Sequence, residues 1–180
     1  MSESKLPIVI QPYTSAHWLA MWRLHLAQLA EHGIHLTDDA IPTVPGLPEH
    51  DRYEWDLNHI DEVYCRGGGG FWLAWQHEEP VGCVGGQDLG GVIELRRMYV
   101  RATHRRQGIG ALLVQALIVH CRTQGINTVE LWTDEGGMGQ PFYEQLGFQQ
   151  VQRPGPGFEG VNQATRRYPK PGEIRMQLKL

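Results

Sequence analysis

The sequence has few of the features that mark disulfide-bonded or metal-binding proteins. Its 180 residues include three cysteines, an odd number, at Cys65, Cys83 and Cys121. These lie far apart and no short Cys/His spacing accompanies them, so neither a disulfide scaffold nor a zinc site is expected, and no metal is assigned. A chain of this length buries enough apolar surface to fold without such cross-links.

Long apolar runs are also missing. One lysine precedes the short run Ile8–Ile10, which Gln11 and Pro12 then interrupt. This pattern predicts neither a signal peptide nor a membrane span, and a cytoplasmic location is expected. No internal repeat is visible, and Gly67–Gly70 is interpreted as a turn rather than a linker, so we expect a single domain over residues 1–180.

The net charge of −4 is small, but it is unevenly distributed. Residues 1–64 contain ten acidic and three basic residues, a net charge of −7, whereas residues 65–180 contain ten acidic and thirteen basic residues, a net charge of +3. The overall acidity, without a basic surface interleaved with aromatics, argues against nucleic-acid binding. The basic residues cluster around one segment, which favours a smaller anionic ligand there. They are Arg96, Arg97, Arg101, His104, Arg105 and Arg106.

That segment is a strand-like run from Glu94 that leads into the turn Gly108-Ile109-Gly110 and then into an apolar helix. The first amides of a helix have no intrahelical partner, and the helix dipole adds positive charge there, so an anion is expected at this turn. Glycine allows close approach to the backbone, and the guanidinium groups of Arg105 and Arg106 are suited to a diphosphate. The turn therefore predicts a nucleotide-type cofactor.

The helix is expected to run from the turn to Gly125, with a strand following at residues 127–133. Strand, helix and strand would form one right-handed βαβ crossover. The residues expected on the main buried face of the helix are Ile109, Leu112, Leu113, Ala116, Leu117 and His120, with Ala111, Val114 and Ile118 as a second apolar face.

Two other phosphate-binding loops fit less well. A Walker A loop requires Gly-Lys-Ser/Thr, but Ala111 and Leu112 follow Gly110 here. A dinucleotide fingerprint requires a third glycine where this chain has Leu113, although Glu130 lies near the spacing of the ribose-binding acid. Neither nucleotide hydrolysis nor dinucleotide binding is therefore expected.

The pattern Arg105-x-x-Gly108-x-Gly110 after a strand resembles the acetyl-coenzyme A signature of the GNAT superfamily of N-acyltransferases. The segment Phe142–Phe148, about thirty residues on, resembles a second motif of that family. The resemblance implies an α/β (α+β) fold with a mixed, mostly antiparallel central sheet, flanking helices and one βαβ crossover. The expected strands are 8–12, 71–77, 80–88, 92–100 and 127–133, with helices near 15–32 and 50–65 before the crossover.

The family resemblance implies an enzyme that transfers an acetyl group from acetyl-CoA to a primary amine by direct attack. The acceptor is expected to be a small molecule, with a protein amino terminus or lysine as the alternative. A non-catalytic acyl-CoA-binding sensor or interaction module is the rival from another class. The resemblance also allows a homodimer.

By the same resemblance, Glu94 is expected to relay the proton of the amine, with Asp134 in reserve, and Tyr143 to protonate the departing sulfur. The alternatives for Glu94 are a solvent-facing strand position or an ion pair with Arg97, and the alternative for Tyr143 is packing of the last helix against the sheet. The residues expected to bind the cofactor are Met98, Tyr99, Val100, Arg105, Arg106, Gln107, Gly108, Ile109 and Gly110.

One position departs from the family pattern. Gly136 stands about seven residues before Tyr143, where many relatives carry an asparagine that reaches toward pantetheine. The acceptor is expected to lie between the loops at residues 32–50 and 154–172.

Overall fold

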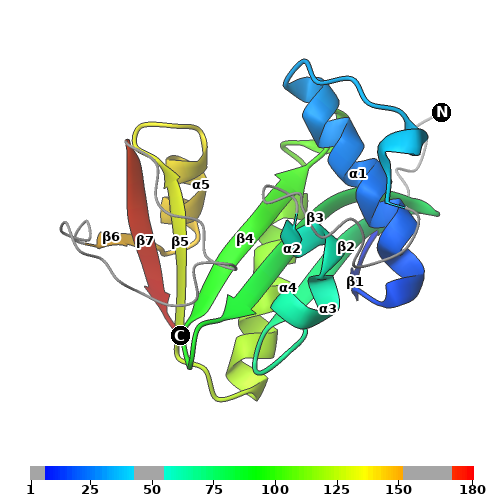
Figure 1. The fold of residues 1–180 in the computed structure, drawn as a ribbon. Helices are drawn as coiled ribbons and strands as arrows, with labels where there is room; N and C mark the ends of the chain where they lie inside the picture. The colour runs from blue at the N-terminus through cyan, green and yellow to red at the C-terminus, as the bar shows by residue number, and fades with distance from the viewer. Residues whose placement is uncertain (1–6, 43–54, 152–171) are drawn as a thin grey trace.

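The computed structural model describes residues 7–42, 55–151 and 172–180, and a seven-stranded sheet runs through them in the order β1-β2-β3-β4-β5-β7-β6 (Figure 1). All neighbouring strands are antiparallel except β4 and β5, which are parallel and are connected through α4. The predicted mixed sheet with one βαβ crossover is therefore confirmed. The strands are β1 (Ile8–Pro12), β2 (Gly70–Gln76), β3 (Glu79–Asp88), β4 (Ile93–Val100), β5 (Thr128–Asp134), β6 (Gln149–Val151) and β7 (Glu173–Lys179). The helices are α1 (Trp18–Glu31), α2 (Trp55–Asn58), α3 (Ile60–Val63), α4 (Ile109–Thr123) and α5 (Gly139–Gln145), with 3-10 turns η1 (Ser15–His17), η2 (Asp38–Ala40) and η3 (Ala102–His104).

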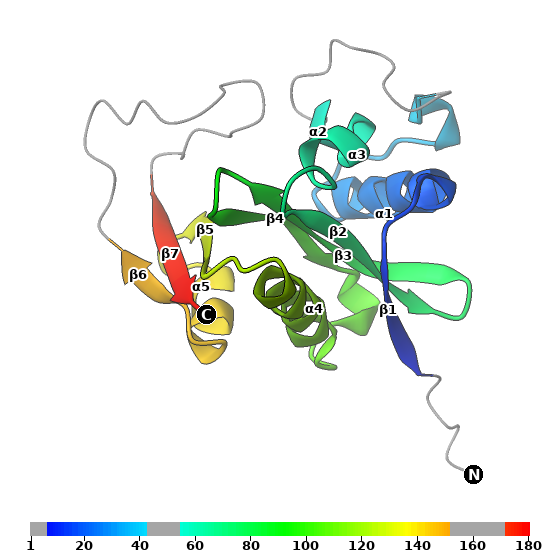
Figure 2. The same ribbon diagram turned by 90° about the horizontal axis from the view of Figure 1, so that it is seen from below.

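Helices cover both faces of the sheet, with α4 on one face and α1, α2 and α3 on the other (Figure 2). Each face has its own apolar core. The core on the α4 side includes Ile93, Leu95, Leu113, Leu117, Val129, Leu131, Tyr143 and Phe148. The core on the α1 side includes Trp22, Leu24, Leu57, Tyr64, Phe71, Leu73, Cys83 and Tyr99.

Helix α4 ends as its sequence predicts. Gly125 has a φ of 71°, the left-handed conformation that favours glycine. The N–H of Ile126 donates to the carbonyl of Cys121 at 2.9 Å and that of Gly125 donates to Arg122 at 3.2 Å, which together form a Schellman motif. The buried face differs in part from the prediction, because Leu112 is 47 % exposed whereas Cys121 is fully buried.

The helix expected near residues 50–65 is two short helices in its described part, and residues 50–54 lie outside the described residues. The interruption falls at His59. Its ring stacks on Trp55 with centroids 4.4 Å apart, and its Nδ1 lies 2.8 Å from the Trp55 carbonyl. This side-chain hydrogen bond occupies a carbonyl that a continuing helix would use for its backbone, so α2 and α3 are separate.

Strand β4 contains a β-bulge. Arg96 and Tyr99 are three positions apart, but their partners on β3 are only two positions apart. Arg97 lies inside the bulge and has a left-handed φ of 52°. The extra residue reverses the alternation of side chains, so Leu95 packs on the α4 side whereas Tyr99 packs on the α1 side.

Candidate active site

The predicted anion-binding turn joins η3 to α4, and its conformation depends on glycine. Gly108 is the N-cap of α4 and has a φ of 80°, while Arg106 before it also has a left-handed φ of 62°. A Cβ at Gly108 would have no heavy atom within 4 Å, so this side of the turn is open. Glycine has no side chain to accept hydrogen bonds from the first amides of α4, and an anion in the open space can accept them instead.

Gly110 is required for a different reason. A Cβ there would lie 3.0 Å from the terminal methyl of Met98 and 3.1 Å from the ring of Phe142. The second glycine of the motif therefore allows α4 to pack closely against β4 and α5. Both glycines are expected to allow ligand approach; a Cβ at Gly110 would meet protein atoms, whereas the space beside Gly108 is open.

Arg105 is held by protein groups. Its guanidinium forms an ion pair with Glu31 at the end of α1 and donates from Nε to the Val100 carbonyl at 2.9 Å. Glu31 also accepts from the Tyr99 hydroxyl at 2.7 Å and from the Ala102 amide at 3.0 Å. Burial opposes the charge on Glu31, but these hydrogen bonds and Arg105 together lower its pKa. The network fixes the segment between β4 and the turn.

The sequence predicts that the other basic residues also gather at the turn, but several of them bind elsewhere. Arg96 donates to Gln87 at 3.0 Å, and Arg97 forms a buried ion pair with Asp56. Arg101 donates to the Pro80 carbonyl at 3.0 Å. Because the β4 bulge and the sheet direct these side chains, adjacency in the sequence does not bring them to one ligand.

Strands β4 and β5 lose their pairing on the way to this turn, and we refer to the place where the two strands part as the opening. Their parallel ladder consists of two pairs, Ile93 with Val129 and Glu94 with Glu130, although both strands continue beyond them. The strands then diverge, as Figure 1 shows. The part of β4 after Glu94 therefore presents backbone groups that β5 does not pair, in the direction that leads to Gly108.

Glu94 lies at the last paired position, at the base of this opening. It is 3 % exposed and faces the α1 side of the sheet, since its neighbours Ile93 and Leu95 pack on the α4 side. Gln87 on β3 and Glu130 on β5 are its register partners, and both are buried. The solvent-facing alternative for Glu94 is therefore wrong, and Arg97, the partner expected in the other alternative, forms an ion pair with Asp56.

Tyr143 approaches from the opposite face. It is 7 % exposed, belongs to the core on the α4 side, and makes edge-to-face contacts with Phe142 and Phe148 at centroid distances of 5.0 and 5.6 Å. Burial raises the pKa of its hydroxyl well above the usual value, so the group is protonated at neutral pH. The packing role expected for this residue is confirmed, and it is compatible with donating a proton.

The residues expected along the cofactor divide between the two faces. Met98 and Val100 pack against the core on the α4 side, and Tyr99 belongs to the core on the α1 side. Their side chains are therefore core residues, and only their backbone groups are available at the edge of β4.

The segment before α5 is a glycine-rich turn. Gly136 has a left-handed φ of 72°, and its N–H donates to the Gln140 side chain at 2.8 Å. Asp134, the reserve base, is exposed at the end of β5, where its carbonyl accepts from Gly137. The loop at 154–171 and the second part of the loop at 32–50 lie outside the described residues; in the first part, Asp38 pairs with Arg23.

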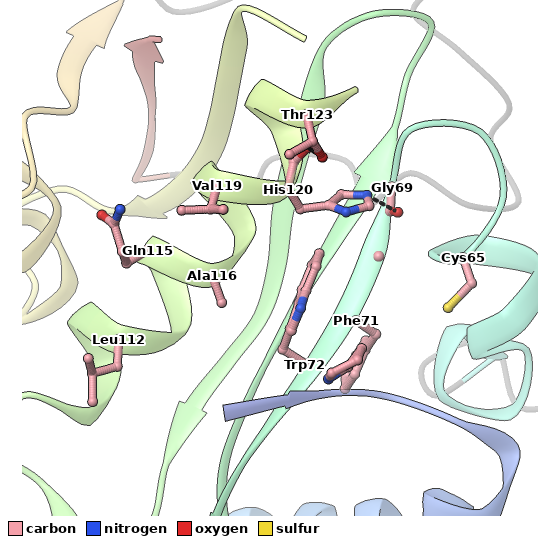
Figure 3. Close-up of a pocket in the computed structure, with 12 residues that line it drawn as sticks. Cys65, Gly69, Phe71, Trp72, Leu112, Gln115, Ala116, Val119, His120 and Thr123 are labelled. Carbon is pink, nitrogen blue, oxygen red and sulfur yellow. Dashed lines mark hydrogen bonds between the residues drawn. The ribbon is translucent and has the colours of Figure 1, made fainter. Parts of the chain in front are cut away.

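A hollow of about 670 Å³ lies elsewhere, between α4 and β2 (Figure 3). Leu112, Ala116 and Val119 line it from the helix, and Trp72 lies beside His120, whose Nε2 is 2.9 Å from the Gly69 carbonyl. None of the residues expected to bind the cofactor lines it. Trp72 belongs to the core on the α4 side, whereas Glu94 faces the α1 side.

The part of the chain that the structure describes lacks two further kinds of feature. Among these residues no group of three His, Cys, Asp or Glu side chains is placed to hold a metal ion. In the same residues no helix has the length and apolar character needed to cross a membrane.

The chain is similar to known acetyltransferases. The model of the acetyltransferase (GNAT) family matches residues 34–148, well over half of the chain. N-acetyltransferase 8 of Homo sapiens is 30 % identical over 104 residues, which cover 53 % of this chain and 46 % of the human protein. The chain therefore belongs to the GNAT family of acetyltransferases.

Solved structures share the fold. A GNAT-family acetyltransferase from Staphylococcus aureus Mu50 has a TM-score of 0.70 at 24 % identity, covering 96 % of this chain and 99 % of that one. The PaiA N-acetyltransferase from Thermoplasma acidophilum, solved in complex with coenzyme A, has a TM-score of 0.65 at 16 % identity, covering 97 % and 100 %. These likenesses confirm the predicted fold class.

Proposed function

We propose that this chain, as a single domain over residues 1–180, transfers the acetyl group of acetyl-CoA directly to a primary amine of a small molecule. One observation carries the proposal: the stretch of β4 that has parted from β5 leads, through the short segment that contains η3, to the open glycine turn at Gly108. An anion site at the turn and the edge of β4 that β5 leaves unpaired would together form one track. Such a track suits a long ligand with amide groups along its arm and phosphates at its end.

The residues at the track fit acetyl-CoA. The amides of Gly108, Ile109 and Gly110 would bind the diphosphate, with Arg106 and Gln107 exposed beside them. Arg105 would act by holding the turn through Glu31, and its charge is already partly neutralised there. The backbone of residues 98–100 would pair with the amides of the pantetheine arm, as a neighbouring strand would.

Glu94 is assigned to the acceptor side. A lysine-like amine with a pKa of about 10.4 must lose a proton before it attacks, which costs about 4.6 kcal/mol at pH 7. A buried carboxylate at the base of the opening can take this proton directly or through a water molecule. Asp134 is exposed at the far end of β5, so it fits this role less well.

The thioester needs two further groups. A backbone N–H on β4 would stabilise the negative charge that develops on the carbonyl oxygen, a contribution of about 2.7–4 kcal/mol for one donor. Tyr143 would give its proton to the departing sulfur from the other face of the sheet. The amine would add to the carbonyl carbon to give a tetrahedral intermediate, and collapse of that intermediate would break the C–S bond as the sulfur takes the proton of Tyr143.

The test combines binding with turnover. Calorimetry with acetyl-CoA should show binding, and an assay for free thiol should show release with small amines, including diamines and amino acids. The panel should also contain peptides with a free amino terminus or a lysine. Release with peptides alone would make the chain a protein acetyltransferase, and binding without release for any acceptor would favour the acyl-CoA-binding sensor.

A further inference from the structure

A buried ion pair fastens the bulge of β4 to α2. Arg97 donates from Nε to Oδ2 of Asp56 at 2.8 Å and from Nη2 to Oδ1 at 2.5 Å, a two-pronged contact. The side chains are 17 % and 5 % exposed. Burial opposes the charge on Asp56, but the Arg97 guanidinium outweighs it and lowers the pKa of this carboxyl. The pair is therefore charged at neutral pH.

Further contacts restrain the same point of the strand. The Tyr64 hydroxyl donates to Asp56, and the ring of Tyr64 lies so close to β3 that a Cβ at Gly85 would be 2.7 Å from it. The Cys83 thiol donates to the Arg97 carbonyl at 3.1 Å. Burial raises the pKa of Cys83 to about 12, so this thiol keeps the proton that it donates. Both the side chain and the backbone of Arg97 are thus held.

The position of the bulge determines the geometry of the next three residues. Along a strand, successive residues direct their backbone groups to alternate edges and their side chains to alternate faces. One extra residue shifts this alternation for everything that follows it. In β4 the residues that follow are 98–100, which the proposed function assigns to the thioester and the pantetheine arm. Arg97 has no intrinsic preference for its left-handed φ of 52°.

We propose that Asp56 is a positioning residue for acetyl transfer. By holding the Arg97 guanidinium it keeps the bulge in place, and so sets which backbone N–H groups of residues 98–100 face the opening between β4 and β5. This inference rests on the proposed function, because it concerns the geometry of the same thioester site. Helix α2 would thus affect the rate of acetyl transfer through Asp56, although no group on α2 touches the reacting atoms.

The test compares Asp56→Asn, Arg97→Gly and the double variant. Asp56→Asn should lower kcat about tenfold to a hundredfold, since a displacement of about 1 Å at a reacting centre has an effect of this size. The dissociation constant of coenzyme A should change by less than about twofold, because the turn at Gly108 is untouched. A merely structural role would lower the melting temperature without this difference between kcat and binding.

The double variant distinguishes the bulge from the charge. Glycine adopts a positive φ without strain, and it removes the guanidinium that in Asp56→Asn has lost its carboxylate partner. Arg97→Gly in the Asp56→Asn background should therefore restore kcat to within about threefold of the parent. Glu62→Gln, on neighbouring α3, is the matched control, since it removes an acid from an exposed ion pair with Arg66. It should leave kcat unchanged.

Hydrogen exchange of residues 93–100 gives a readout that needs no turnover. Exchange should be faster in Asp56→Asn than in Glu62→Gln and should slow again in the double variant. A parental kcat and exchange rate in Asp56→Asn would overturn the inference, as would a double variant no more active than Asp56→Asn. If Asp56→Asn does not fold, Arg97→Lys replaces it, and a parental kcat there would be equally decisive. Absence of thiol release by the parent would instead refute the proposed function.

Discussion

Substitution of Gly108 by alanine tests the anion-binding turn most directly. The φ of 80° lies in the left-handed region, where an L-residue costs about 1–2 kcal/mol. No heavy atom lies within 4 Å of the added Cβ, so this conformational cost is the whole expected effect on stability. If the turn relaxes, at least one N–H bond to the phosphates is lost, and a hydrogen bond to a charged group contributes about 1.5–3 kcal/mol. The dissociation constant of acetyl-CoA should therefore rise about tenfold to a hundredfold.

Gly125 provides a matched control at the opposite end of the same helix. Its φ is 71°, and a Cβ there would also have no heavy atom within 4 Å. Gly108→Ala and Gly125→Ala should lower the free energy of unfolding in urea by similar amounts. Calorimetry should show weaker binding of acetyl-CoA only for Gly108→Ala. Equal affinities in the two variants would refute the assignment of the phosphates to this turn.

Three further substitutions address the chemistry and the stability of the fold. Glu94→Gln should lower kcat about 10²–10⁴-fold with unchanged affinity for acetyl-CoA, and the loss should be largest at low pH, where little of the amine is uncharged. Glu130→Gln, at the buried neighbouring position, should leave kcat unchanged. The reverse result would assign the base to Glu130 on β5. Tyr143→Phe should lower kcat about 30-fold, the equivalent of about 2 kcal/mol, and the deficit should fade as pH rises through about 8.5, the thiol pKa; a deficit independent of pH would contradict the role. Asp88 accepts bonds from three glycine amides at 2.9 Å, which outweigh burial and lower its pKa. Its contribution to stability is present above the unfolded pKa of about 3.9 and is lost as pH falls through the folded value, so Asp88→Asn should lower the melting temperature at pH 7 and not near pH 2, and equal lowering at both would contradict this account.

The crossover could be predicted from the sequence because its signals are local. The glycines at 108 and 125 mark the two ends of α4, and the apolar spacing between them is helical. Both glycines have a left-handed φ, which is usual at the C′ position of Gly125 and is particular to this turn at Gly108. The order of strand, turn, helix and strand then requires a parallel pair, which is what β4 and β5 form.

The partners of the basic residues could not be predicted, because they come from distant parts of the chain. Glu31 lies 74 positions before Arg105, and Asp56 lies 41 positions before Arg97. Nothing in the alternation of residues 93–100 marks the bulge, since two adjacent arginines fit a strand edge as well as an insertion. The sequence therefore predicts one ligand for several arginines, whereas in the structure Arg105 pairs with Glu31 and Arg97 pairs with Asp56, and both pairs hold β4.

The placement of Glu94 and Tyr143 on opposite faces of the sheet separates their roles in a way that chemistry can detect. A base acting on the amine affects only the acceptor, so each unit by which the acceptor pKa falls should reduce the Glu94→Gln deficit by up to about tenfold. Protonation of the sulfur does not depend on the pKa of the acceptor amine, so the loss of kcat in Tyr143→Phe should stay constant along the same series of amines. A sensor that had lost turnover would require neither group at the opening between β4 and β5. Dependence of one deficit and not the other on the acceptor would show that the two residues act on opposite sides of one thioester, and parallel changes would contradict that arrangement.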